Sequence, residues 1–443
     1  MSAILHRSLT GALPVAVRGE GAYLFDRAGK RYLDASGGAA VSCLGHSSPR
    51  VIAAVREQVG KMPFAHTSFF TNEPAEELAS LLIERAPEGF GAGRVAFVGS
   101  GSEAMEVALK LARQAMVERG EPERTRFIAR RMSYHGNTLG ALSVGGHMQR
   151  RALYAPMLMP VSHIAPCHAY RFQDEGETAE AYGRRVADEL EAEILRIGPE
   201  RVAAFVAEPV VGATLGCVTA VPGYFKRIRE ICDRYGVLLI ADEVMCGMGR
   251  TGSFFASAFE EICPDIITTA KGLGAGYQPM AAVLVAQSLV DVLSAGTGLL
   301  ANGHTYMSHP VACAAAVAVI RTIEEDDLLD AVNARGDELR EALEARFGQH
   351  PHIGDIRGRG LFLALEFVQN RETKEPLPRA LRLAETLKVK LQEAGLIAYP
   401  SSGTADGSDG DHLLFAPPYI VTSDEIAEMV EITGRVLSDL LPA

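Results

Sequence analysis

Two charged residues stand at the ends of neighbouring apolar segments. Asp242 follows the run VLLIA (237–241), and Lys271 ends the run DIITTAK (265–271). Short apolar and β-branched runs are typical of buried strands in a parallel sheet. We therefore expect both side chains at the carboxyl edge of that sheet, where open α/β sheets bind ligands. A lysine there can attack a carbonyl group, but a plain buried ion pair is the alternative that these two residues leave open.

A third acid fits the same pattern. Glu208 directly follows the apolar residues 202–207 of RVAAFVAEP (201–209), and a helix is expected over 224–235, before the segment of Asp242. This strand–helix–strand rhythm favours a parallel sheet with right-handed crossovers. Three successive strands would each present a charged group at the ligand-binding edge, which favours a functional site over an isolated ion pair.

A candidate phosphate-binding turn precedes these strands. The segment 94–98 is typical of a strand, 99–102 reads Gly-Ser-Gly-Ser, and a one-faced helix is expected from Glu103 onward. Free N–H groups and the positive end of the helix dipole suit an anion at Gly101 and Ser102. The spacing matches neither the Walker loop nor the dinucleotide-binding fingerprint. The alternative is an ordinary helix cap by Ser102.

An aromatic pair follows the strand expected over 126–130. Tyr134 and His135, next to Gly136, can stack on a flat ring, although ordinary packing is the favoured explanation when such a pair stands alone. A carboxylate can keep a ring nitrogen protonated, so that the ring accepts electrons. A lysine, an acid, a phosphate turn and a stacking aromatic together describe a site for pyridoxal 5′-phosphate (PLP).

The remaining elements must position these residues. A β-hairpin is expected over 21–34 and a strand over 358–368, in a smaller domain. A final helix is expected after 423–425. Further helices are expected over 51–61, 73–85, 183–196, 310–323, 331–347 and 379–394.

Composition narrows the class of protein. The 443 residues are 48% hydrophobic and 22% charged, which predicts a large core and two domains. A net charge of -12 disfavours binding to nucleic acid or to an anionic membrane. The seven cysteines form no CxxC pair, so neither a metal site nor a disulfide framework is predicted. Residues 1–14 lack the apolar core of a signal peptide and no segment resembles a membrane span, so we expect a cytoplasmic protein.

The chain resembles the class III aminotransferases, the fold-type I family that includes ornithine, GABA and amine:pyruvate transaminases. The resemblance covers essentially the whole chain. It rests on SGSEA (100–104), SYHGNT (133–138), AEP (207–209), DEV (242–244), GMGRTG (247–252), TTAKGLGAGYQP (268–279) and GHTYMSHPVACAA (303–315), which occur in the family's order. It implies an α/β fold: a large domain (56–325) with a mostly parallel seven-stranded sheet flanked by helices, and a small α/β domain built from both chain ends (1–55 and 326–443).

The resemblance also implies PLP as the cofactor and a role for each site residue. Lys271 would form the internal aldimine and then shuttle a proton, and Asp242 would pair with the pyridine nitrogen. Other cofactor contacts would come from Gly101, Ser102, Tyr134, His135, Glu208, Val244 and Thr305. Thr305 would reach the phosphate bound by a partner subunit, which implies a homodimer with active sites at the interface, a tetramer being the alternative. An ordinary loop threonine is the other interpretation of Thr305.

Three arginines that bind carboxylates in such relatives are absent. Leu414 stands where ornithine and GABA transaminases usually have arginine, and Asn137 stands where GABA-type enzymes often have one. The residues Gly407, Ser408 and Asp409 occupy the place of the mobile arginine of amine:pyruvate transaminases. Candidate replacements are Arg150, Arg151 and Arg359, with surface charge as the alternative. The stretch 401–411 is either a solvated loop or an active-site flap.

The sequence therefore predicts an aminotransferase that moves an amino group from a primary amine or amino acid to a keto acid, pyruvate or 2-oxoglutarate, through a Lys271 aldimine. A PLP-dependent lyase that acts on an amino-phospho or related amine substrate is the alternative within PLP chemistry. A non-catalytic PLP-binding protein would not require a reactive lysine, so the presence of Lys271 disfavours that alternative.

Overall fold

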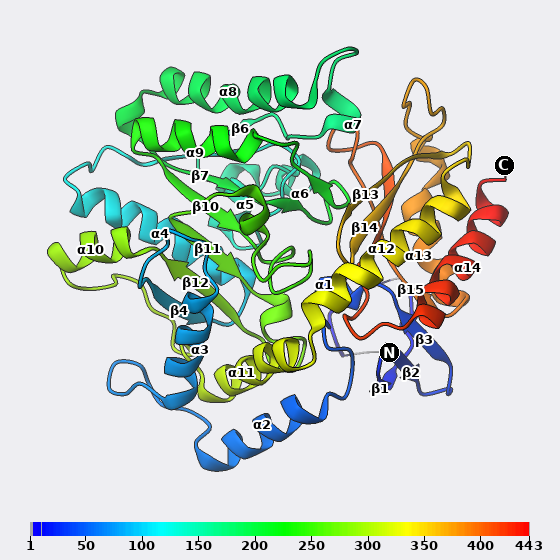
Figure 1. The fold of residues 1–443 in the computed structure, drawn as a ribbon, viewed down its shortest axis with the longest axis horizontal. Coiled ribbons are helices and arrows are strands. Elements are labelled where there is room, and N and C mark those ends of the chain that lie inside the picture. Colours follow the sequence, from blue (N-terminus) through cyan, green and yellow to red (C-terminus); the bar gives the residue numbers. More distant parts are fainter. Residues whose placement is uncertain (1–2, 10, 443) are drawn as a thin grey trace.

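The computed structural model describes residues 3–9 and 11–442, and its centre is a seven-stranded sheet with the order β4-β12-β11-β10-β7-β5-β6 (Figure 1). β12 runs antiparallel to β11 and β4, and the other neighbouring pairs are parallel. The mostly parallel sheet expected from the sequence is confirmed. Its strands are β4 (Arg94–Val98), β5 (Arg126–Arg130), β6 (Val161–Ile164), β7 (Val202–Ala207), β10 (Leu238–Asp242), β11 (Ile266–Thr269) and β12 (Ala281–Val285).

Helices cover both faces of this sheet. The apolar side chains of β12, which point alternately to one face and the other, show why. Val283 packs with α4 (Gly101–Glu118), whereas Leu284 packs on the opposite face with α3 (Glu73–Glu84) and α11 (Pro310–Glu325). Successive side chains of a strand point to opposite faces, so a run of apolar residues must be covered twice. Further helices in this part of the chain are α2 (Pro49–Lys61), α5 (Leu139–Val144), α6 (Met148–Ala152), α7 (Ala169–Phe172), α8 (Ala179–Ile197), α9 (Tyr224–Tyr235) and α10 (Gln287–Ala295).

Both ends of the chain build a second, smaller group of sheets. Strand β15 (Leu396–Ile397) pairs in parallel with β3 (Arg31–Asp34), with Leu396 opposite Leu33. This pairing inserts a late segment beside the N-terminal hairpin, and it confirms the small α/β unit expected from the two chain ends. Its other elements are β1 (Ala16–Glu20), β2 (Tyr23–Asp26), β13 (Ile353–Arg359), β14 (Phe362–Phe367), β16 (Tyr399–Ser402), β17 (Asp411–Phe415), α12 (Leu328–Phe347), α13 (Leu383–Glu393) and α14 (Ser423–Leu440).

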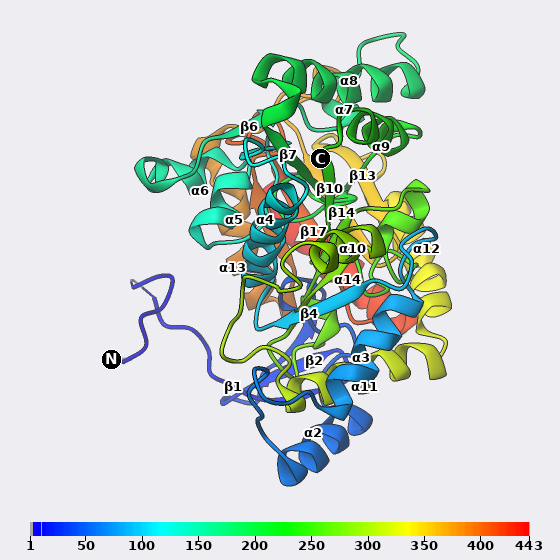
Figure 2. The ribbon, with the colours of Figure 1, turned by 90° about the vertical axis from the view of Figure 1, so that its left-hand side faces the viewer.

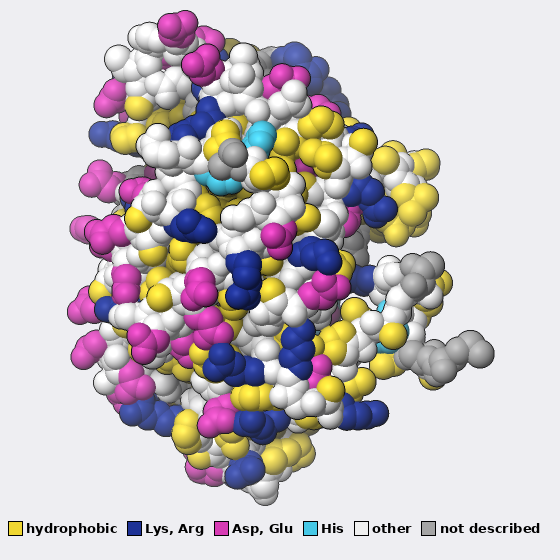
Figure 3. Space-filling view, turned by 90° about the vertical axis from the view of Figure 1, so that its right-hand side faces the viewer, with side chains coloured by type: hydrophobic (Ala, Val, Ile, Leu, Met, Phe, Trp, Pro, Cys, Tyr) yellow, Lys and Arg dark blue, Asp and Glu magenta, His cyan; other side chains and the backbone are white. Residues whose placement is uncertain are grey.

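We propose that the domain boundaries follow these two groups, at 1–55, 56–325 and 326–443. Figure 2 shows that the described part of the segment before β1 extends away from the rest of the molecule. Acidic and basic side chains are interspersed on the face in Figure 3, unlike the continuous basic stripe that binds a nucleic-acid backbone. Within the described ranges, no helix is long and apolar enough to cross a membrane.

Most expected elements are confirmed with ends that differ by a few residues, and three details are wrong. The segment 358–368 is not one strand, because β13 ends at Arg359 and a turn at Gly360, with φ +56, precedes β14. The helix expected over 379–394 is broken at Arg382, where φ is +47. The cap of α4 is Ser100 and not Ser102, since the Ser100 hydroxyl accepts the N–H of Glu103 at 3.2 Å.

Gly336 on α12 illustrates how closely the elements of the small unit pack. A Cβ atom at this position would lie 2.5 Å from the carbonyl group of Gly360, a backbone contact that cannot rotate away. Replacing an exposed helical glycine by alanine stabilises a protein by about 0.5–1 kcal/mol, but overpacking costs about 1–3 kcal/mol. We expect Gly336→Ala to lower the free energy of unfolding by about 1–2 kcal/mol, since overpacking outweighs helix propensity.

A matched control is Gly60→Ala on α2, where a Cβ atom would meet nothing within 4 Å. This variant should unfold at a slightly higher temperature than the parent protein because only helix propensity changes. Thermal unfolding of the PLP-saturated proteins, followed by circular dichroism, compares the two. Equal stabilisation by both substitutions would contradict the packing argument.

Candidate active site

A cavity of about 470 Å³ lies at the carboxyl ends of β7, β10 and β11. These strands are neighbours in the sheet, so the residues that follow them meet at one edge, as expected for an open α/β sheet. The cavity wall includes all the predicted cofactor residues except Thr305, namely Gly101, Ser102, Tyr134, His135, Glu208, Asp242, Val244 and Lys271.

Lys271 follows β11 in a left-handed backbone conformation, with φ +45, which is uncommon for a residue with a side chain. Its ammonium makes no hydrogen bond or ion pair within the described part of the chain. Burial lowers the pKa of Lys271 to about 8, and the nearby acids Asp242 and Glu208 oppose this shift. A larger share of the amine is therefore neutral near physiological pH, which is the nucleophilic form.

Asp242 is held in one orientation by three neighbours. One carboxylate oxygen, Oδ2, lies 2.7 Å from Nδ1 of His135. The other, Oδ1, accepts the N–H of Val244 at 3.1 Å and the hydroxyl of Thr268 at 3.4 Å. Thr268 stands directly opposite Asp242 in the β10–β11 pairing, so the sheet register supplies this contact. His135 is buried and belongs to the cavity wall, where it fixes the carboxylate.

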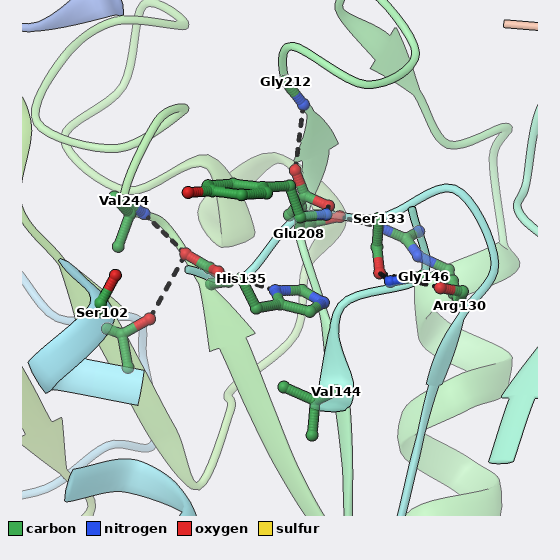
Figure 4. Close-up of polar contacts among 12 residues, drawn as sticks. Ser102, Arg130, Ser133, His135, Val144, Gly146, Glu208, Gly212 and Val244 are labelled. Carbon is green, nitrogen blue, oxygen red and sulfur yellow. Dashed lines mark hydrogen bonds and ion pairs between the residues drawn. The ribbon is translucent and has the colours of Figure 1, made fainter. Parts of the chain in front are cut away.

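Glu208 is a buried acid whose carboxylate has no arginine partner among the described residues. Its two oxygens accept the backbone N–H groups of Tyr134, at 3.2 Å, and Gly212, at 3.0 Å (Figure 4). Arg130 donates to the backbone carbonyl of Glu208 and not to its carboxylate. Leu414 on β17 lies in an apolar cluster and brings no charge. Burial therefore raises the pKa of Glu208, and the nearby His135 only partly offsets that shift.

Close backbone packing shapes the turn before α4. A Cβ atom on Gly101 would lie 2.9 Å from Cγ1 of Val244, so glycine keeps this wall of the cavity open. The Ser102 hydroxyl accepts the N–H of Asn137 at 2.9 Å, which ties the turn to the segment of Tyr134. Gly136, with φ +135, permits that approach, because its Cβ would lie 2.8 Å from the Ser102 hydroxyl.

The three candidate replacement arginines lie in different surroundings. The guanidinium carbon of Arg150 lies 4.7 Å from the centre of the Tyr134 ring, next to the cavity. Arg151 instead donates to backbone carbonyls, including those of Leu142 and Gly145. Arg359 lies over the ring of Phe259, 4.0 Å from its centre, and lines none of the Lys271 cavity. Arg150 is therefore the candidate that the fold places at the site.

Thr305 is exposed and lines a second cavity beside the first. Residues Gln278, Pro279 and Met280 belong to the walls of both. Within one chain, Thr305 does not join Lys271, and its contact with a partner's phosphate stays a prediction.

The stretch 401–411 joins β16 to β17 and is not fully solvated. Thr404 is buried, and its hydroxyl donates to Glu366 at 3.0 Å. Ser408 lines a cavity together with Met148 and Gln149 of α6. The loop thus lies beside the segment that carries Arg150, and the flap hypothesis stays a prediction.

Comparison with known proteins identifies the family. The family model described as aminotransferase class-III matches residues 6–437. The chain belongs to this family. It is 46% identical over 431 residues to an uncharacterized aminotransferase of Schizosaccharomyces pombe, covering 97% of this chain and 94% of that protein. It is 37% identical over 436 residues to the mitochondrial gamma-aminobutyrate transaminase 1 of Oryza sativa subsp. japonica, covering 96% of this chain and 81% of that protein.

Solved structures agree with this assignment. The omega transaminase of Pseudomonas jessenii in complex with PMP is 36% identical, and the alignment covers 97% of this chain and 93% of that one with a TM-score of 0.89. The predicted fold type is therefore confirmed. The protein is an aminotransferase, and PLP is the cofactor of its family.

The cavity of this aminotransferase fits PLP. The amine of Lys271 has no competing partner among the described residues, and Asp242 offers an oriented carboxylate. Gly101 forms a wall that a Cβ atom would narrow. Among the described residues, no group of three or more metal-ligating side chains is found.

Some cavity residues lay outside the expectations from sequence. Examples are the wall residues Gly136, Val41, Ala213, Met245 and Gln278, and Thr268, which contacts Asp242 from behind the wall. The sequence did contain a hint of the role of Gly136, since a glycine between Tyr134-His135 and a helix lets the backbone approach a neighbouring segment closely. The others depend on strand register or on contacts between distant segments, which a single sequence does not display.

Proposed function

We propose that this aminotransferase moves an amino group from a primary amine or amino acid to a keto acid, with pyruvate or 2-oxoglutarate as the acceptor. The observation that carries the proposal is the pairing of two groups in one cavity: the unpartnered amine of Lys271 and the fixed carboxylate of Asp242. The lyase alternative gains no support from the relatives, because each relative named above is an aminotransferase or a transaminase.

PLP, when bound, supplies an aldehyde that takes up the substrate amine and a ring that accepts electrons from the substrate carbon. Lys271 would bind the cofactor, then take the proton from the amine-bearing carbon at its Nζ and return it on the other side of the transfer. Its pKa of about 8 lies close to neutral pH, which suits a group that both accepts and donates a proton.

The other residues would bind and orient the cofactor. Asp242 would hold a proton on the ring nitrogen, and His135 would keep its carboxylate aligned. Tyr134 and Val244 would pack against the ring, and Gly101 and Ser102, at the N-terminus of α4, would bind the phosphate. Glu208 would shape the substrate side of the cavity, since its carboxylate is already held by two backbone N–H groups.

One experiment tests the reaction class. The PLP-loaded enzyme is mixed with a panel of amines and amino acids without any keto acid, and its absorption spectrum is followed. Conversion to the pyridoxamine form, reversed by pyruvate or 2-oxoglutarate, supports the proposal. Continuous release of ammonia or phosphate, with the starting spectrum restored, would replace it by the lyase.

The depressed pKa of Lys271 predicts the pH dependence of PLP uptake. Burial lowers this pKa from the usual 10.5 to about 8, so the neutral, reactive amine increases as the pH rises toward 8 and then saturates. We expect the rate of PLP uptake by cofactor-free enzyme to level off above about pH 8–9, where an ordinary lysine would show no plateau. Stopped-flow absorbance measures this rate. A rate that continues to rise to about pH 10 would contradict the prediction.

We also propose a homodimer in which Thr305 reaches the phosphate of the partner's site, a tetramer being the alternative. In support, the exposed fractions of Phe69 and Tyr306 are 79% and 68% in the single chain, which is unusual for aromatic side chains. Sedimentation of the active enzyme tests this, and a fully active monomer would overturn it. The rice relative is named as mitochondrial, so the cytoplasmic location expected from the sequence stays a prediction.

A further inference from the structure

A keto acid brings a carboxylate into a cavity that already contains two acids. Glu208 and Asp242 belong to its wall, and Lys271 is the cation among the described wall residues. Under the proposed function, on which this inference rests, Lys271 serves the cofactor and the proton transfer. The carboxylate of the acceptor therefore needs a second cation, and arginine is the side chain that binds carboxylates in a bidentate manner.

Most arginines around the cavity already have partners. Arg130 donates to the carbonyl of Glu208, and Arg250 donates to the carbonyls of Leu361 and Pro417. Both guanidinium groups are buried, so neither can turn toward a substrate without losing these bonds.

Two arginines of the small unit are engaged as well. Arg357 pairs with Asp355 and Glu366, and Arg379, beside the loop 401–411, pairs with Asp409 at 2.9 Å. A substrate carboxylate would have to replace an existing acid at either position. These arginines are therefore poor candidates for substrate binding.

Arg150 differs from all of them. Its guanidinium makes no hydrogen bond or ion pair within the described part of the chain, and it stacks on Tyr134, 4.7 Å from the ring centre. Stacking uses the face of the guanidinium plane and leaves the N–H groups at its edge free to donate. The next residue, Arg151, binds the carbonyls of Leu142 and Gly145, which anchors α6 while Arg150 stays available.

We propose that Arg150 binds the carboxylate of the keto-acid acceptor at the mouth of the Lys271 cavity. Tyr134 belongs to the cavity wall and holds the guanidinium beside it, so a carboxylate bound at the edge of Arg150 lies next to the reacting groups. Arg150 is then a residue that determines specificity. It discriminates between substrates with and without a carboxylate, and it takes no part in proton transfer.

The test uses Arg150→Ala and Arg150→Lys, with Arg184→Ala on α8 as the matched control, because Arg184 is exposed and unpaired within the described ranges. For Arg150→Ala, the KM for pyruvate should increase by about 10- to 100-fold with little change in kcat. Conversion of the PLP form by 1-phenylethylamine, which has no carboxylate, should be unchanged. The KM of Arg150→Lys for pyruvate should lie between those of Arg150→Ala and the unmodified enzyme, since lysine keeps the charge without the bidentate geometry.

A binding measurement separates this role from a structural one. Calorimetry of the PMP-loaded proteins with L-lactate, a carboxylate that cannot accept an amino group, should show the same loss of affinity for Arg150→Ala. An unchanged KM for pyruvate with unchanged lactate binding would overturn the proposal. Equal losses in both half-reactions, with weaker PLP binding, would also overturn it, because Arg150 would then only support Tyr134.

Different results would contradict the proposed function and the proposed role of Arg150. If the unmodified enzyme transfers no amino group to any keto acid, the reaction class is wrong before any variant is compared. The lactate titration then still decides whether Arg150 binds a carboxylate.

Discussion

Lys271→Ala lowers the rate of amino transfer by about 10⁴-fold or more, the upper range for loss of a positioned acid–base group. The described cavity wall offers no second amine, because its other titratable side chains are Glu208, Asp242, Tyr134 and His135, the last of which is bound to Asp242. The variant also loses the visible absorption band of lysine-bound PLP. Single-turnover kinetics of the PLP-loaded variant measure the first effect, and a spectrum of the purified protein measures the second.

The matched control is Lys226→Ala on α9, an exposed lysine that should leave both readouts unchanged. Added methylamine should partly restore proton transfer in Lys271→Ala, because the cavity then holds a small amine at the vacated position. If Lys271→Ala retained the rate of the unmodified enzyme, the assignment of the acid–base group would be wrong.

Asp242→Asn is expected to lower kcat by about 10²- to 10³-fold, as for other losses of preorganised electrostatic stabilisation. The amide has the same shape, so the packing around Val244 and Thr268 is retained. What changes is the negative charge that would keep the ring nitrogen protonated. Without that charge the ring accepts electrons poorly, and the proton on the substrate carbon becomes harder to remove.

The control for the second variant is Asp337→Asn on α12, an exposed position far along the chain from the cavity residues. PLP affinity should decrease only modestly in Asp242→Asn, since the phosphate and stacking contacts remain. A kcat that matches the control would show that the carboxylate does not act on the ring.

The charged residues at the carboxyl ends of the strands in the large sheet could be predicted from the sequence, because they depend on local patterns. Asp242, Lys271 and Glu208 each follow an apolar run, and the rule for parallel sheets places such residues together. Ser100, however, replaced Ser102 as the helix cap, since both serines suit the position and only backbone geometry separates them. The turn at Gly360 was missed because an apolar segment of that length also reads as one strand.

Contacts between distant segments could not be predicted. The absence of an arginine at Leu414 was visible from the sequence, but the backbone N–H groups of Tyr134 and Gly212 that bind the Glu208 carboxylate were not. Likewise, the sequence offered Arg150, Arg151 and Arg359 as equals. Only the fold shows that Arg151 is occupied by carbonyls while Arg150 lies over Tyr134.

The parallel pairing of β15 with β3 has a consequence for the order in which the enzyme matures. β3 lies between the hairpin strand β2 and a strand that the ribosome makes more than three hundred residues later. The segment after β3 contributes Val41 to the cavity wall, and the backbone of Cys43 is bound by Tyr419, near the end of the chain. Domains generally fold as units during synthesis, but this wall cannot close until the segment that carries Tyr419 has been made. We therefore expect this side of the cavity to form only after the segment around Tyr419 has packed against the N-terminal segment.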